Sequence, residues 1–279
     1  MLSYLHEYHA GNFADVHKHA SLLLALSMMQ AKPAAIAGFD THAGSAVYNL
    51  AGERARKTGE AEAGIQRVWQ LRDRLTSADW QPLLAVLEQL NPQQDKLTRY
   101  PGSPAWFAGL QRPQDTLTAF ELHSGESSRL RAWAGDHRAT VAEGDGLQGL
   151  LRALPPRAPR LLVLTDPSYE LREDYQRVGH TLAKAWQKCR HGVFLVWYPL
   201  LTSGVHRALP EHVSGSGVNR VWRTELALNR PPARGMTGSV MLVVNPPWGF
   251  AERLAAMMAE VAGPEGLDVR HTQGWLVPE

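Results

Sequence analysis

Short runs of apolar and β-branched residues alternate along the chain with longer stretches of helical period. Seven runs predict strands, at residues 34–40, 117–121, 139–143, 161–165, 193–197, 218–228 and 239–244. Helices are predicted at residues 15–31, 127–135, 146–154, 173–189, 200–213 and 250–261. Because this alternation is typical of βαβ units, we predict an α/β fold with a seven-stranded, mostly parallel sheet.

Two intervals depart from the alternation. Only residues 229–235 join the last two predicted strands, and a parallel crossover needs about a dozen residues or more, so these strands should form an antiparallel hairpin. The long interval 41–116 contains two further stretches of helical period, the second after a possible N-cap at Ser77. We therefore predict a small helical subdomain at 53–100, inserted after the first strand into a main domain of residues 1–52 and 101–279.

Composition indicates an ordinary globular protein: of the 279 residues, 44% are hydrophobic and 20% are charged. The single cysteine, Cys189, excludes an intramolecular disulfide and a cysteine-based zinc site. The first residues contain no apolar signal region, and no run approaches the roughly 18 to 20 apolar residues of a membrane span, so we expect a cytoplasmic protein. A net charge of +2 gives no strong indication of a nucleic-acid partner.

Acidic residues stand at the ends of the first three predicted strands. Asp40 opens a turn of small residues that ends at Gly44, Glu121 ends the second strand, and Asp145 follows the third. Acids at such strand tips often accept hydrogen bonds from ribose hydroxyls, and glycine lets the backbone approach a ligand. A solvated carboxylate at Glu121 and a helix cap at Asp145 are the alternatives. The three acids together favour a nucleoside pocket.

The tetrapeptide Asp166-Pro167-Ser168-Tyr169 follows the fourth predicted strand. It resembles the (Asp/Asn)-Pro-Pro-(Tyr/Phe) motif of class I S-adenosylmethionine-dependent methyltransferases that act on exocyclic or amide nitrogens. In that motif a carboxylate and a proline carbonyl accept the two N–H bonds of the target amino group and localise its lone pair, and the aromatic ring stacks on an extruded base. An ordinary turn after a strand is the alternative.

Beyond this motif, the whole chain resembles one family, the bacterial methyltransferases that modify N6 of an adenosine in 23S ribosomal RNA. Matching blocks lie at residues 1–4, 9–12, 14–16, 18–19, 40–44, 100–104, 121–123, 145–146, 197–199, 234–237, 245–248 and 275–279. The resemblance implies a Rossmann-like fold with a helical insertion, S-adenosylmethionine as the cofactor and 23S rRNA as the partner. We expect a monomer.

The resemblance also implies roles for individual residues. The cofactor contacts implied are His19, His42, Ser103, Glu121, Asp145, Gly146 and Asp166. Asp166, with Pro167 and Tyr169, is implied to be catalytic, and Tyr4 to touch the RNA. We add Lys18 to the cofactor site because a cation near the start of a helix suits an anionic or polar ligand, although a solvated basic face is the alternative. The chain departs from the family motif at Ser168, where the family has a proline that rigidifies the turn.

Two other groups of residues resemble a functional site, one a methyltransferase motif and the other a metal site. Asn245-Pro246-Pro247-Trp248 matches the methyltransferase motif formally better, but it follows a strand predicted to be antiparallel, so we interpret it as a structural turn at the opposite edge of the sheet. The N-terminal histidines His6, His9, His17 and His19 do not have the spacing of a usual zinc site, and we expect no metal.

Basic residues crowd two regions that are candidates for contact with RNA phosphates. They are Arg54, Arg56, Lys57, Arg67, Arg72 and Arg74 in the insertion, and Arg220, Arg223, Arg230 and Arg234 near the hairpin. The family resemblance implies methyl transfer to an adenosine of 23S rRNA. Two alternatives stay open: a DNA adenine-N6 methyltransferase using the same motif, and a non-catalytic RNA-binding protein that has lost turnover through Ser168.

Overall fold

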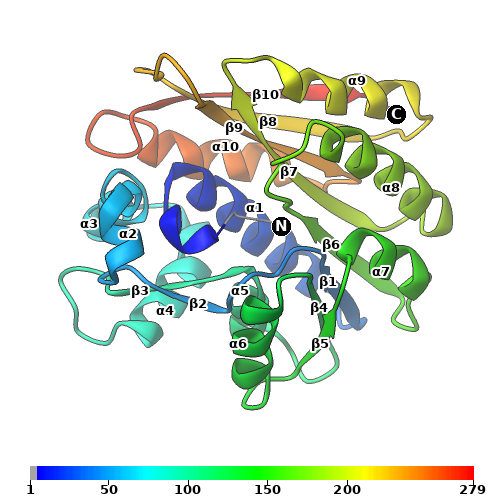
Figure 1. Ribbon diagram of the computed structural model, residues 1–279, viewed down its shortest axis with the longest axis horizontal. Coiled ribbons are helices and arrows are strands. Elements are labelled where there is room, and N and C mark those ends of the chain that lie inside the picture. The colour runs from blue at the N-terminus through cyan, green and yellow to red at the C-terminus, as the bar shows by residue number, and fades with distance from the viewer. Residues whose placement is uncertain (1–4) are drawn as a thin grey trace.

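The computed structural model describes residues 5–279, and its centre is an eight-stranded sheet with helices on both faces (Figure 1). The strand order is β10-β8-β9-β7-β6-β1-β4-β5. The strands are β1 (Ile36–Asp40), β4 (Thr116–Glu121), β5 (Ala139–Glu143), β6 (Arg160–Thr165), β7 (Val193–Leu201), β8 (Val221–Leu228), β9 (Met236–Val244) and β10 (Val269–Val277). Strands β5, β4, β1, β6 and β7 are parallel, and β9, β8 and β10 continue the sheet with antiparallel pairings.

The order of the strands places a ligand crevice at one edge of the sheet. From β1 the chain goes first to β4 and β5 on one side, then returns to β6 on the other. Connections that diverge in this way leave a crevice outside the carboxyl ends of the two central strands. Asp40 at the end of β1, Glu121 at the end of β4 and Asp166 just after β6 therefore come to the same edge.

Helix α1 (Phe13–Gln30) lies inside the molecule. Its side chains share one hydrophobic core with α5 (Ser103–Leu110), α10 (Phe250–Val261) and one face of the sheet. A helix that is apolar on most sides is normally a buried one. Its few polar side chains, Lys18 among them, are consequently buried as well.

The other helices join the strands in the manner of βαβ units. Helix α6 (Ser124–Ala134) follows β4, α7 (Gly146–Ala153) follows β5, α8 (Asp174–Lys188) follows β6, and α9 (Ala208–Gly215) follows β7. Because each helix begins where its strand ends, the amino termini of these helices lie at the carboxyl edge of the sheet. Helices α7, α8 and α9 build the second hydrophobic core on the face opposite α1.

The long interval after β1 holds a two-stranded sheet of β2 (Val47–Asn49) and β3 (Arg99–Pro101), with three short helices between them, α2 (Glu53–Thr58), α3 (Ile65–Gln70) and α4 (Gln81–Leu90). Single turns of 3-10 helix lie at η2 (Glu60–Ala63), η3 (Arg72–Arg74) and η4 (Ala78–Trp80). The buried side chains of α3 and α4 belong to the same core as α1. The division of the chain at residues 53 and 100 stays a prediction.

The predicted fold class and the β8–β9 hairpin are confirmed. The sheet has eight strands instead of seven, because β10 is an edge strand whose residues are mostly exposed or half-buried and give only a weak apolar signal. Strand β7 continues to Leu201, so the helix predicted from residue 200 begins only at Ala208, after the turn η5 (Val205–Arg207). Helix α5 was not predicted from the sequence.

Candidate active site

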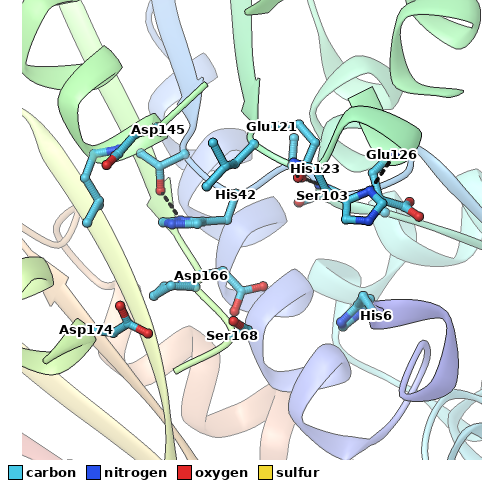
Figure 2. A pocket seen from close by; sticks show the side chains of 18 of the residues that line it. His6, His42, Ser103, Glu121, His123, Glu126, Asp145, Asp166, Ser168 and Asp174 are labelled. Atoms are coloured by element: carbon cyan, nitrogen blue, oxygen red, sulfur yellow. Dashed lines mark hydrogen bonds between the residues drawn. The ribbon is translucent and has the colours of Figure 1, made fainter. Parts of the chain in front are cut away.

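A pocket opens at the carboxyl ends of β1, β4 and β6 (Figure 2). Figure 2 shows His6, His123 and Glu126 on one side of it and Asp145 and Asp174 on the other. Nine of the predicted site residues line it: Lys18, His19, His42, Ser103, Glu121, Asp145, Gly146, Asp166 and Pro167. The structure thus brings together residues that are far apart in the sequence. Tyr4 lies outside the described residues.

Lys18 connects α1 to the loop after β6. Its ammonium group donates a hydrogen bond to Oδ2 of Asp166 and lies 2.9 Å from Oδ1 of Asp15. Burial alone would lower the pKa of Lys18, but the two carboxylates together raise that pKa above its ordinary value. Lys18 is therefore a buried cation whose charge is compensated on both sides.

Asp15 holds this cation from the side away from the pocket. Its carboxylate accepts a hydrogen bond from the Gly11 N–H at 2.8 Å, and its Oδ2 lies 2.9 Å from Nε2 of His6. Burial raises the pKa of Asp15, but His6 and Lys18 together lower it well below its ordinary value. Four side chains, His6, Asp15, Lys18 and Asp166, thus form a continuous chain of charge-assisted contacts, which are stronger than neutral hydrogen bonds.

Asp166 remains available to a ligand. Lys18 occupies Oδ2, and among residues 5–279 no hydrogen bond to Oδ1 is present. Burial raises the pKa of Asp166, and the charge of Lys18 opposes that rise. One carboxylate oxygen is consequently fixed while the other is free to accept a hydrogen bond in the pocket.

Two histidines of the pocket are neutral. Burial lowers the pKa of His42 to about 4 and that of His19 well below its ordinary value. Nδ1 of His19 lies 2.7 Å from the Tyr100 hydroxyl, and Nδ1 of His42 lies 2.8 Å from Oγ1 of Thr41. A hydroxyl group therefore holds Nδ1 of each ring, and this contact fixes the direction in which Nε2 points.

Glu121 and Asp145 are both fixed by backbone N–H groups. The two oxygens of Glu121 accept hydrogen bonds from Gly44 and His123, each at 2.7 Å. Oδ1 of Asp145 caps α7 by accepting from Leu147 and Gln148. The capping interpretation of Asp145 is thus what the structure shows, and its implied contact with the cofactor stays a prediction.

Gly146 allows two elements to approach closely at the pocket floor. A Cβ atom at this position would lie 1.8 Å from the Thr41 carbonyl oxygen, a distance that no side chain tolerates. Glycine is therefore required where α7 begins beside the turn after β1. This contact is a packing reason for Gly146, independent of any ligand.

Tyr169 does not line the pocket. Its ring stacks on Tyr175 with centroids 4.3 Å apart, and its hydroxyl donates to the Trp197 carbonyl oxygen at 2.7 Å. Its φ of 52° is unusual for a residue with a side chain. In this arrangement the ring is buried. The predicted stacking of Tyr169 on a base stays a prediction. Ser168, in contrast, does line the pocket.

Several pocket residues were not identified from the sequence. Glu126, from the first turn of α6, accepts a hydrogen bond from the Ser45 hydroxyl, and Arg177 of α8 pairs with Asp145 at 2.8 Å. Charged residues in a first helical turn look in a sequence like any solvated helix face, so they gave no signal. His6 belongs to the N-terminal group of histidines, but histidines grouped in a sequence suggest only a metal site, and here their spacing does not fit one.

The second Asn-Pro-Pro-aromatic sequence lies elsewhere. Asn245 follows β9, which is antiparallel to β7, and it does not line the pocket. Its side-chain amide donates to the carbonyl oxygens of Arg190 and Gly192, each at 2.8 Å. These bonds close a turn near the start of β7, as the structural interpretation of this sequence predicts.

Most residues of the two basic clusters already have partners inside the protein. In the insertion, Arg54 pairs with Glu7 and Arg74 with Glu265. The other partnered members are Arg67, bonded to the Gly266 carbonyl, Arg72, stacked on Trp69, Arg220, paired with Glu279, Arg223, paired with Glu225, and Arg230, paired with Asp268. In the described part of the chain, only Arg56, Lys57 and Arg234 of these clusters are left without such a partner.

Two general features of the described residues bear on the class of site. No three histidine, cysteine, aspartate or glutamate side chains among residues 5–279 are grouped so that they could hold a metal ion. No helix in the same range is long and apolar enough to cross a membrane.

Comparison with known proteins gives full-length matches. A family model described as ribosomal RNA large subunit methyltransferase D, RlmJ, matches residues 33–271. Two proteins named ribosomal RNA large subunit methyltransferase J, from Escherichia coli and Haemophilus influenzae, are 36% and 35% identical to this chain, with 100% of each chain covered. A crystal structure of a Legionella pneumophila protein is similar with a TM-score of 0.88 and 29% identity, covering 96% of this chain and 98% of that one.

The buried carboxyl group of Asp40 predicts a pH dependence of stability. Burial raises the pKa of Asp40 from 3.8 to about 7, against the lowering effect of Ser103 and the His42 N–H. The folded state therefore holds this proton more tightly than the unfolded state, and stability from this group is lost as the pH rises from about 4 to 7. We expect Asp40→Asn to reduce that loss, by up to about 4 kcal/mol at pH 8.

Urea unfolding of the parent and Asp40→Asn at pH 4, 6 and 8 measures the effect. Asp95→Asn, a change at an exposed position, is the control. A constant difference in free energy of unfolding between parent and Asp40→Asn across this range would contradict the raised pKa.

Proposed function

Because the chain belongs to the family of ribosomal RNA large subunit methyltransferases described as RlmJ, we propose that it transfers a methyl group from S-adenosylmethionine to N6 of an adenosine in 23S rRNA. The family resemblance inferred from the sequence blocks is confirmed by these matches. We further propose that it acts in the cytoplasm as a monomer.

One observation carries the proposed reaction: Asp166, the first residue of the methyltransferase tetrapeptide, lies at the pocket with one oxygen held by Lys18 and the other free. An amino group on a purine is a weak nucleophile because its lone pair is delocalised into the ring. A carboxylate oxygen and the Pro167 carbonyl, which both only accept hydrogen bonds, are suited to localise that lone pair. A chain that only bound RNA would not need this arrangement.

The pocket suits the cofactor in its charge and in its hydrogen-bond acceptors. Its lining includes five carboxyl groups, on Glu121, Glu126, Asp145, Asp166 and Asp174, against the cations of Lys18 and Arg177. An acidic lining favours a sulfonium compound that also carries an ammonium group. Glu121, whose two oxygens are oriented by backbone N–H groups, can accept hydrogen bonds from ribose hydroxyls. When bound, S-adenosylmethionine supplies an electrophilic methyl group.

The protein's own contribution is positioning and electrostatics. Lys18 fixes the orientation of Asp166 and compensates its charge. Neutral His19 and His42 add no positive charge that would oppose a cationic cofactor. Preorganised groups of this kind cost no reorganisation at the moment of reaction. Among the alternatives, a DNA substrate is disfavoured by the family match, and loss of turnover through Ser168 is open to experiment.

We predict that Asp166→Ala abolishes methyl transfer to an rRNA fragment, whereas Asn245→Ala leaves turnover near that of the parent. The reason is strand polarity: Asp166 follows a parallel strand into the pocket, and Asn245 follows an antiparallel one away from it. Transfer of labelled methyl groups to the RNA measures turnover, and the rise in melting temperature with S-adenosylmethionine reports on cofactor binding.

Asp166→Ala should still be stabilised by the cofactor, since Glu121 and the α7 cap remain. An inactive Asn245→Ala together with an active Asp166→Ala would show that the wrong tetrapeptide has been assigned. The same assay on duplex DNA tests the DNA alternative, and a parent protein that methylates DNA but not RNA would overturn the proposed substrate.

Ser168 generates a separate prediction. No hydrogen bond joins Ser168 to Asp166 in the described part of the chain, so serine does not block the carboxylate. Proline at this position would mainly restrict the loop, an effect of about 0.4–1 kcal/mol. We therefore expect Ser168→Pro to raise the single-turnover rate several-fold with little change in cofactor affinity. If the parent shows no turnover and Ser168→Pro restores it, the non-catalytic alternative is right for this chain.

A further inference from the structure

The acidic pocket cannot by itself bind the backbone of a nucleic acid. Its five carboxyl groups outnumber its cations, Lys18 and Arg177, and both cations are already paired with carboxylates of the site. A polyanion gains affinity from basic side chains that replace its counterions. If the proposed function holds, cations outside the pocket must therefore bind the phosphates next to the target adenosine.

Two groups of unpaired cations stand on elements that adjoin the pocket. Arg56 and Lys57 stand in the last turn of α2, and both are exposed without an ion pair among the described residues. Arg172 stands in the turn between Ser168 and Asp174, two residues that line the pocket, and it too is exposed and unpaired in that part of the chain.

Contacts with the N-terminal segment fix α2 at the pocket. The 3-10 turn η1 (His6–Tyr8) contributes His6 to the pocket lining. Arg54 of α2 pairs with Glu7 of this turn at 3.0 Å, and the Thr58 hydroxyl bonds to the Tyr8 carbonyl oxygen. Figure 1 shows α2 beside this N-terminal turn. The Glu7 carboxylate, and to a smaller extent that of the pocket residue Glu126, raises the pKa of Arg54 above its ordinary value.

The elements that adjoin these two groups lie on opposite sides of the pocket. Figure 2 shows His6, which η1 carries, on one side and Asp174, which follows Arg172, on the other. The catalytic loop with Asp166 and Ser168 lies between them. A polynucleotide strand that reached both groups would pass over the pocket mouth.

We propose that the RNA strand carrying the target adenosine crosses the pocket mouth from α2 to the turn before α8. Arg56 and Lys57 bind its phosphates on one side, and Arg172 binds them on the other. The target base enters the pocket between these contacts. Phosphate contacts position the strand without specifying its sequence, so this surface sets affinity and register and leaves the choice of base to the pocket. The proposal rests on the proposed function for the identity of the partner.

The test measures binding of an rRNA fragment at increasing salt concentration. The variants are the double change Arg56→Ala with Lys57→Ala, and the single change Arg172→Ala. A matched control carries Lys32→Ala and Arg157→Ala, also one lysine and one arginine, exposed and unpaired among the described residues. These two precede β1 and β6 and therefore lie at the sheet edge opposite the pocket.

We expect the plot of log affinity against log salt to become less steep by about 0.7 for each phosphate of a single strand that the protein no longer neutralises. The change is then about 1.4 for the double variant and about 0.7 for Arg172→Ala. The control should keep the parent slope. Stabilisation by S-adenosylmethionine should stay at the parent level, because none of these residues lines the pocket. Exchanging the two side chains, with Arg56→Lys and Lys57→Arg, should leave the parent slope unchanged because both positive charges remain.

Parent slopes in both variants, or an equal change in the control, would overturn the proposed surface. These outcomes are separate from a failure of the proposed function, which would appear as a parent protein that binds the fragment without methylating it. The slopes of the variants test the surface in either case, because binding is measured without turnover.

Discussion

The ammonium group of Lys18, held between the buried carboxylates of Asp15 and Asp166, is the interaction on which the site depends. Two carboxylates in a buried place would repel each other and lose their hydration, and one cation between them offsets both penalties. Breaking such a buried pair by removing one partner is costly, since it leaves an uncompensated charge. The same interaction joins α1 to the loop after β6, so the orientation of the Asp166 carboxylate is set by a helix that lies far before it in the chain.

Lys18 can perform this task because α1 is fixed in the centre of the molecule. His17, its neighbour, is fully buried, and its two ring nitrogens lie 3.1 and 3.2 Å from the hydroxyls of Ser239 and Thr224. Ser239 also accepts a hydrogen bond from the indole N–H of Trp197, whose ring lies 5.7 Å from the Lys18 ammonium. The helix is therefore held against rotation by polar contacts to the sheet, in addition to its apolar packing. Small changes in this buried network would therefore alter the position of Lys18 and the orientation of the Asp166 carboxylate.

Much of this arrangement is predictable from the sequence. Parallel strand order brings the residues after β1, β4 and β6 to one edge, so the strand pattern alone groups Asp40, Glu121 and Asp166, and strand polarity excludes Asn245. What could not be predicted depends on side chains meeting across long separations. The contact of Lys18 with Asp166, the buried stack of Tyr169 on Tyr175 and the internal partners of most surface arginines have no signal in spacing or composition. Strand β10 was not predicted because an edge strand is only half apolar.

The most direct measurement is the single-turnover rate of methyl transfer for Asp15→Asn on an rRNA fragment, beside the melting temperature with and without S-adenosylmethionine. Asp15 does not line the pocket, and its carboxylate contacts Lys18, His6 and the Gly11 N–H. If the buried charge chain holds Asp166 in its working orientation, the rate falls by roughly tenfold or more, while stabilisation by the cofactor persists and Asp15→Glu recovers part of the rate. A folded Asp15→Asn protein with the rate of the parent would contradict the account.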